Sequence, residues 1–224
     1  MSLFKDVLNL WRSDDLLSQA WNESYKMLQL SREMFIQSVT MLRKQSKEKT
    51  LIALKKRDRE INEFQRDIRR KVMTHLVLQE DSTDIPNGLV LVNIVVDIER
   101  LGDYCKNILD LAISTPKTFK TEKVSEDLKI IEDEVITRFD QTMEALHSQD
   151  SEVAQELITT HRKMVAKTSD KLVDKILKGK ITFNSESKAV TVAIYARYLK
   201  RIGSHLTNVM TTLVNPFEAI GYKK

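Results

Sequence analysis

The chain has 224 residues, of which 42% are apolar and 30% charged, so it is long enough for one large or two small domains and is neither disordered nor fibrous. Its 5 glycines and 3 prolines are too few for turn-rich β-sandwiches, β-propellers or glycine-rich nucleotide folds, and they favour long helices. The net charge of +4 is too small to indicate a nucleic-acid partner, and the single cysteine, Cys105, excludes an intramolecular disulfide.

Residues 1–14 predict a short amphipathic helix. The apolar side chains that share its face are Leu3, Phe4, Val7, Leu8 and Trp11. We expect this helix to cap an end of the folded chain, and docking onto a partner or an interface is the alternative. No signal peptide is visible, and the longest apolar run, residues 89–96, is too short to span a membrane, so we expect a soluble protein.

Apolar residues then recur every three or four positions, which predicts six long helices. Their expected ranges are 16–42, 48–78, 86–114, 125–147, 151–177 and 185–214. The expected boundary residues are Asp14 or Asp15, Asp150 and Asn184 as N-caps, Asp84 before Pro86 at a helix start, and Gly179 just beyond a helix end.

The last three helices repeat the first three. Residues 98–108 align with residues 199–209 at a constant offset of 101, so that Gly102 matches Gly203 and Asn107 matches Asn208. Glycine inside a helix costs about 1 kcal/mol relative to alanine. The paired glycines therefore predict a close approach between helices.

This pattern predicts an all-α fold of two three-helix repeats that form a six-helix bundle. The expected domain boundaries are 1–14 for the N-terminal helix, 15–115 and 121–215 for the two repeats, and 216–224 for a tail.

Two acidic pairs form the candidate site. Glu99 and Asp103 are four residues apart on one helix, and Asp58 and Asn62 have the same spacing on the preceding helix. Converging carboxylates repel each other and need a cation, and oxygen donors suit Mg²⁺, Ca²⁺, Mn²⁺ or iron. The alternative is a solvated helix face on which Glu99 pairs with Arg100 or Lys106.

Other chemistry has weaker support. A carboxylate-bridged di-iron enzyme needs two Glu-x-x-His motifs, whereas the chain has one, Glu144–His147, at a helix end. No nucleophilic triad, phosphate loop or zinc cluster is visible. We expect Cys105 to be a buried apolar residue, and the remaining histidines to be surface or core residues: His75, His161 and His205. The basic segment 44–71 predicts a solvated face, or a contact with an acidic partner or an anionic membrane.

The motifs resemble those of the PhoU family of phosphate-uptake regulators. The matching segments are residues 97–104 and 106–108, residues 197–205 with Asn208, and residues 58–62. The resemblance spans roughly residues 15–214. It implies a cytoplasmic, non-enzymatic adaptor that links a phosphate transporter of the ABC type to a membrane sensor histidine kinase. It also implies that a homodimer can form. It implies no nucleic-acid partner, and membrane association only through partner proteins.

The resemblance also implies metal clusters, one in each repeat. Carried over by position, the ligands of a divalent or iron ion in repeat 1 are Glu99, Asp103, Asp58 and Asn62. Repeat 2 has Lys200 and Ser204 where the family has acids, so we expect no metal there, because an ammonium repels a cation. The alternative functions are a carboxylate-bridged metal-dependent enzyme and a metal-free accessory module of a sodium–phosphate cotransporter.

Overall fold

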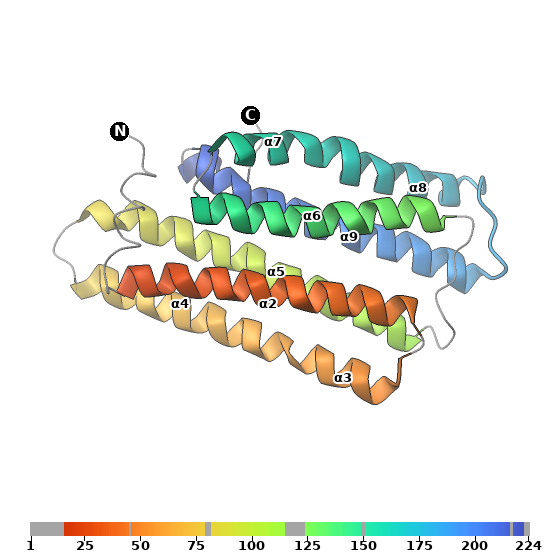
Figure 1. Ribbon diagram of the computed structural model, residues 1–224, viewed down its shortest axis with the longest axis horizontal. Helices are drawn as coiled ribbons and strands as arrows, with labels where there is room; N and C mark the ends of the chain where they lie inside the picture. The colour runs from red at the N-terminus through yellow and green to blue at the C-terminus, as the bar shows by residue number, and fades with distance from the viewer. Residues whose placement is uncertain are drawn as a thin grey trace.

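The computed structural model describes residues 16–44, 46–78, 82–114, 124–148, 151–215 and 217–221. The long helices within these ranges lie side by side in an elongated bundle (Figure 1). Their bounds are α2 (Leu16–Arg43), α3 (Glu48–Lys56), α4 (Asp58–Leu78), α5 (Ile85–Ser114), α6 (Ser125–Ser148), α7 (Ser151–His161), α8 (Lys167–Leu177) and α9 (Glu186–Val214). Short 3₁₀ turns cover Ser82–Asp84 and Phe217–Ala219.

The structure confirms the all-α prediction. The predicted helix over 1–14 and the predicted N-caps Asp14, Asp15 and Asp150 lie outside the described residues. No helix in the part of the chain that the structure covers combines the length and the apolar character needed to cross a bilayer.

The middle helix of each repeat fills its predicted range, 48–78 or 151–177, but contains a local break in its hydrogen-bond pattern. The first divides at Arg57, whose N–H bonds to the carbonyl of Leu54 at 3.0 Å, three residues back, and tightens the last turn of α3. The second contains the π-helical turn Arg162–Ala166 between α7 and α8. Such local changes of hydrogen-bond register leave the apolar spacing almost intact, so periodicity does not reveal them.

The link between α8 and α9 shows one confirmed and one wrong boundary residue. Gly179 has φ +65°, and the bond from the N–H of Lys180 to the carbonyl of Lys175, at 2.8 Å, completes the expected glycine-terminated helix end. Asn184 is not the N-cap of α9. Ser185 takes that role, because its hydroxyl accepts the N–H three residues on at 3.3 Å.

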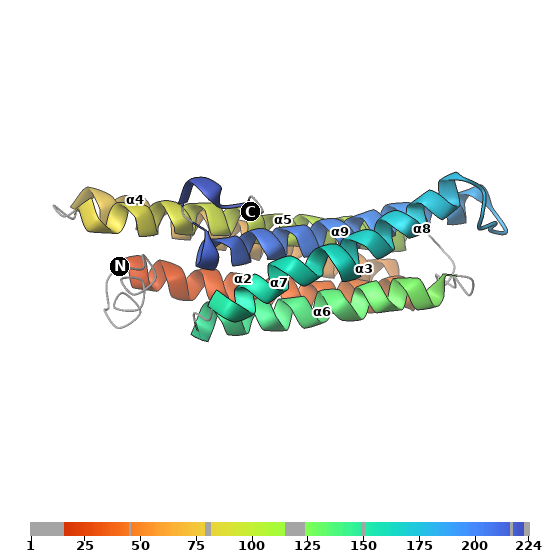
Figure 2. The same cartoon turned by 90° about the horizontal axis from the view of Figure 1, so that it is seen from above.

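The two repeats share one core. Helices α2, α4 and α5 pack together, as do α6, α7, α8 and α9, and the repeats meet through α5 against α9 and α2 against α6. Figure 2 shows α4, α5 and α9 in one layer, with α2 and α6 in the other. The rings of Phe35 and Phe139, whose centroids are 5.6 Å apart, join the apolar clusters of the two repeats.

Gly102 confirms the predicted close approach. A Cβ atom at this position would lie 2.6 Å from Cδ1 of Ile61, which is fully buried on α4. Glycine therefore sets the spacing between α4 and α5. Its counterpart Gly203 is buried on α9.

Candidate functional site

An ion-pair cluster lies between α4 and α5, where the sequence placed the acidic pairs. Nζ of Lys106 is 2.9 Å from Oδ2 of Asp58 and 2.9 Å from Oδ1 of Asp103. The side-chain amide of Asn62 donates to Oδ2 of Asp58 at 3.0 Å, and Nη1 of Arg100 donates to Oδ2 of Asp103 at 3.0 Å. The structure thus brings Asp58, Asn62 and Asp103 together around a lysine ammonium.

Glu99, the fourth predicted ligand, stands one turn before Asp103 on α5. Its closest cation is Arg100, with 3.7 Å between Oε2 and Nε. Burial, followed by the Asp103 and Asp58 carboxylates, raises the pKa of Glu99, although Arg100 acts in the opposite direction. Glu99 is therefore the least neutralised acid of the cluster.

Gly102 and the helix end make room for Asp58. Its Oδ1 is buried, has no hydrogen-bond partner among the described residues, and lies 3.4 Å from the position of a Cβ on Gly102. Asp58 is the first residue of α4, where the helix dipole favours a negative charge. A larger residue at position 102 would press against this carboxylate.

The donor set as arranged does not fit a metal ion. Among the described residues, no group of three or more His, Cys, Asp or Glu side chains is placed to hold one. Asn62 turns an N–H toward Asp58, and Lys106 stands between the two aspartates. Metal binding by Asp58, Asn62, Glu99 and Asp103 stays a prediction of the sequence.

Repeat 2 holds a different ion pair. Nζ of Lys200 lies 2.7 Å from Oδ1 and 2.6 Å from Oδ2 of Asp170, and Nη1 of Arg197 lies 2.6 Å from Oδ1. Asp170 lies on α8, within the middle helix of repeat 2. The sequence analysis did not identify this ion pair. The pattern that could have indicated it is the presence of Arg197 and Lys200 on α9 without an acid near them in the sequence.

A polar seam between α5 and α9 was also missed. Nδ1 of His205 lies 2.7 Å from Oδ1 of Asp97, and the amide of Asn208 donates to the same oxygen at 3.0 Å. His205 is buried, which is one of the two positions expected from the sequence. It lies at the contact between the two repeats rather than in the core of one repeat. The available signal was a polar residue within otherwise apolar helix stripes on both α5 and α9.

Aromatic rings continue this seam toward the surface. The Tyr104 ring lies 5.7 Å from the rings of both Tyr198 and His205, and Nε of Arg201 donates to the Tyr104 hydroxyl at 3.2 Å. Arg201 is exposed and both tyrosines are partly exposed. We call the surface that carries Arg100, Tyr104, Tyr198 and Arg201 the motif face, because it combines the matched motifs of both repeats.

A buried hydrogen-bonded cluster, which we call the clamp, joins α2 and α6 to α9. The Tyr195 hydroxyl donates to Oε1 of Glu132 at 2.6 Å, and Nη2 of Arg43 donates to the same oxygen at 2.8 Å. Burial, and then the Glu132 carboxylate, raises the pKa of Tyr195. The clamp joins α2, α6 and α9, so its role is structural.

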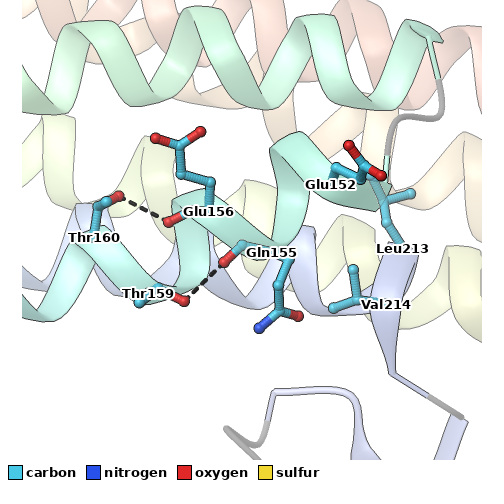
Figure 3. Close-up of a pocket in the computed structure, with 7 residues that line it drawn as sticks. All are labelled: Glu152, Gln155, Glu156, Thr159, Thr160, Leu213 and Val214. Atoms are coloured by element: carbon cyan, nitrogen blue, oxygen red, sulfur yellow. Dashed lines mark hydrogen bonds between the residues drawn. The ribbon is translucent and has the colours of Figure 1, made fainter.

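An open groove of about 710 Å³ lies between α7 and the end of α9. Figure 3 shows the side chains that line it. Glu152 and Glu156 supply carboxylates, and Leu213 and Val214 supply apolar surface. Thr160 turns its hydroxyl back to the carbonyl of Glu156 at 3.0 Å. The two carboxylates would repel an anion such as phosphate.

The remaining predicted residues take structural places. Cys105 is fully buried, and burial raises the pKa of its thiol, as expected of a core residue. His75 is buried with Nε2 2.8 Å from Asp84. His147 lies near the Tyr25 ring, with centroids 6.2 Å apart, and the side chain of His161 lies outside the described residues.

The basic segment 44–71 is partly neutralised. Arg57 pairs with Glu60 at 3.2 Å and Arg70 with Asp67 at 3.0 Å. Other arginines of α4 stay exposed beside an open groove of about 480 Å³, whose lining is Arg59, Asn62, Glu63, Gln65 and Arg66. Contact with an acidic partner or an anionic membrane stays a prediction.

Comparison with known proteins gives a consistent result. The PhoU domain pattern matches residues 25–112 and again 128–213. A phosphate-specific transport system accessory protein PhoU homolog from Clostridium acetobutylicum is 24% identical over 205 residues, covering 88% of this chain and 90% of the homolog.

Two solved structures share the fold. PhoU from Pseudomonas aeruginosa superposes with a TM-score of 0.78 at 18% identity, covering 89% of this chain and 95% of that one. The phosphate transport system regulatory protein PhoU from Streptococcus pneumoniae gives 0.76 at 16% identity, covering 88% and 93%. The chain therefore belongs to the PhoU family of phosphate transport regulatory proteins, which are not enzymes, and carries two PhoU domains.

Proposed function

We propose that the chain is a cytoplasmic adaptor that docks on the ATPase of an ABC-type phosphate transporter and passes the transporter's state to a membrane sensor histidine kinase. The names of its relatives support the transporter, since one is an accessory protein of a phosphate-specific transport system. The kinase is the part of the proposal that comes from the resemblance in sequence alone.

The motif face is the observation that carries the proposal. Tyrosine and arginine are enriched among the residues that dominate binding energy in protein interfaces. Here Tyr104, Tyr198 and Arg201 form one contacting group at the junction of the repeats, on the layer opposite α2 and α6. A partner that docks here contacts both repeats at once. Its binding therefore depends on how the two repeats are placed relative to each other.

Binding of tagged protein to the purified ATPase, and separately to the cytoplasmic part of the kinase, tests the proposal. Arg201→Glu should weaken ATPase binding at least about tenfold, the scale of a single interface hot spot. Lys26→Glu, an exposed charge reversal on α2, is the matched control and should bind as the wild type does. Equal binding by both variants would refute the motif face as the docking surface.

The sodium–phosphate cotransporter is the competing partner. The same assay against the cotransporter's cytoplasmic loops, in phosphate-rich and phosphate-poor buffer, separates the two. Binding to the cotransporter with none to the ATPase would overturn the proposal.

A further inference from the structure

We propose that Lys106 is the built-in counter-ion of Asp58 and Asp103, so that repeat 1 carries its cation as a side chain and takes a divalent ion only when this lysine is removed. This role of Lys106 depends only on charges within the chain, whichever partner the chain docks on.

The geometry of Lys106 supports this role. Its ammonium is equally distant, at 2.9 Å, from one oxygen of each aspartate, and it bridges α4 to α5 as a shared ligand would. The side chains of Lys106, Asp58 and Asp103 are 29%, 10% and 27% exposed, so the ammonium lies at the mouth of the cluster with Asp58 beneath it. An ion entering from solvent meets this positive charge first.

Lysine stays charged in this place. The ordinary pKa of a lysine ammonium is about 10.4, well above neutral pH. The aspartates therefore face a permanent cation at neutral pH.

Repeat 2 also joins its third helix to its middle helix through a lysine, although this lysine serves a single acid. Lys200 contacts both oxygens of Asp170, again from the third helix of the repeat to the middle helix. Two independent lysine-on-aspartate bridges at the same helix pair indicate that side-chain cations hold these helices together in both halves of the chain.

Removal of Lys106 would release Oδ2 of Asp58, the oxygen that the ammonium contacts, and leave it beside the buried Oδ1. This oxygen has no partner among the described residues and lies in the same cluster as Asp103 and Glu99. Without the ammonium, Asp58 would keep only the neutral amide of Asn62 as a partner in the described part of the chain. Hard oxygen donors of this kind bind Mn²⁺ and Mg²⁺.

The test compares wild type with Lys106→Met, using Lys55→Met as the matched control. Lys55 also bridges to α5, where its Nζ lies 2.5 Å from Oδ1 of Asp110, but it serves a single acid. Each protein is incubated with MnCl₂ or MgCl₂ in millimolar excess. Metal content is measured after desalting, and the melting temperature is measured with and without the ion.

We expect wild type and Lys55→Met to retain no stoichiometric metal and to melt within about 1 °C of their metal-free values. Lys106→Met should retain roughly one ion per chain and gain about 3 °C or more with Mn²⁺. A wild type that holds stoichiometric metal, lost in Asp58→Asn, would overturn the proposal even if Lys106→Met does not fold. A folded Lys106→Met with no response to either ion would overturn it as well.

Discussion

Gly102→Ala is the sharpest test of how the two acidic helices are spaced. The new methyl carbon would sit 2.6 Å from Cδ1 of Ile61, whereas carbon atoms in good contact are about 3.5–4.0 Å apart. Ile61 is fully buried and cannot swing aside without displacing its neighbours. Overpacking of this kind costs about 1–3 kcal/mol. Replacing glycine by alanine in a helix returns about 1 kcal/mol, so we expect a net loss of about 1 kcal/mol.

Ile61→Val removes the atom that the new methyl would strike. Alone, it should cost about 0.5–1.5 kcal/mol. In the double variant the alanine methyl fills the vacated space, so the combined loss should be smaller than the sum by about 1 kcal/mol. Urea unfolding followed by circular dichroism at 222 nm measures all four proteins of the cycle.

Gly179→Ala is the matched control. Nothing lies within 4 Å of a Cβ at Gly179, but its φ of +65° strains any other residue, so we expect a loss of about 1 kcal/mol that Ile61→Val does not relieve. If Gly102→Ala proves more stable than the wild type, or if its effect simply adds to that of Ile61→Val, the close-approach argument is wrong.

Three further predictions concern buried or half-buried groups. Because the pKa of Glu99 is raised, its charge destabilises the fold at pH 7; Glu99→Gln should unfold at higher urea there, and the gain should vanish below about pH 4.5, where Glu99 is protonated in both states. A Gln variant that is weaker at pH 7 contradicts this. Tyr195→Phe should cost about 1–3 kcal/mol, because Glu132 loses a buried donor. With its raised pKa, Tyr195 keeps its proton in the folded state, so the wild type should lose stability above about pH 10 more steeply than Tyr195→Phe; parallel curves would refute the assignment. Cys105 should react with a thiol reagent only on unfolding, and rapid labelling of the native protein would contradict its burial.

Local patterns predicted most of the architecture. Apolar spacing located the long helices to within a few residues, and the match of Gly102 with Gly203 identified the repeat. These features depend on the positions of residues along one helix, which the sequence states directly.

The features that were missed depend on how two helices are placed against each other. The pairing of Asp170 with Lys200, and of Asp97 with His205, is set by the relative register of packed helices. A shift of one turn would exchange every partner. For the same reason the sequence brought Asp58 and Asp103 together correctly but did not place Lys106 between them, although it named that lysine as a partner for Glu99.

The shared core has a consequence for how such a duplicated chain can change over time. Helix α5 packs on α9, and α2 packs on α6. Removal of either repeat would therefore expose apolar surface on the other repeat. Lys200 and Ser204, at the positions that match Glu99 and Asp103, therefore lie in a half of the chain that the other half needs for its own packing.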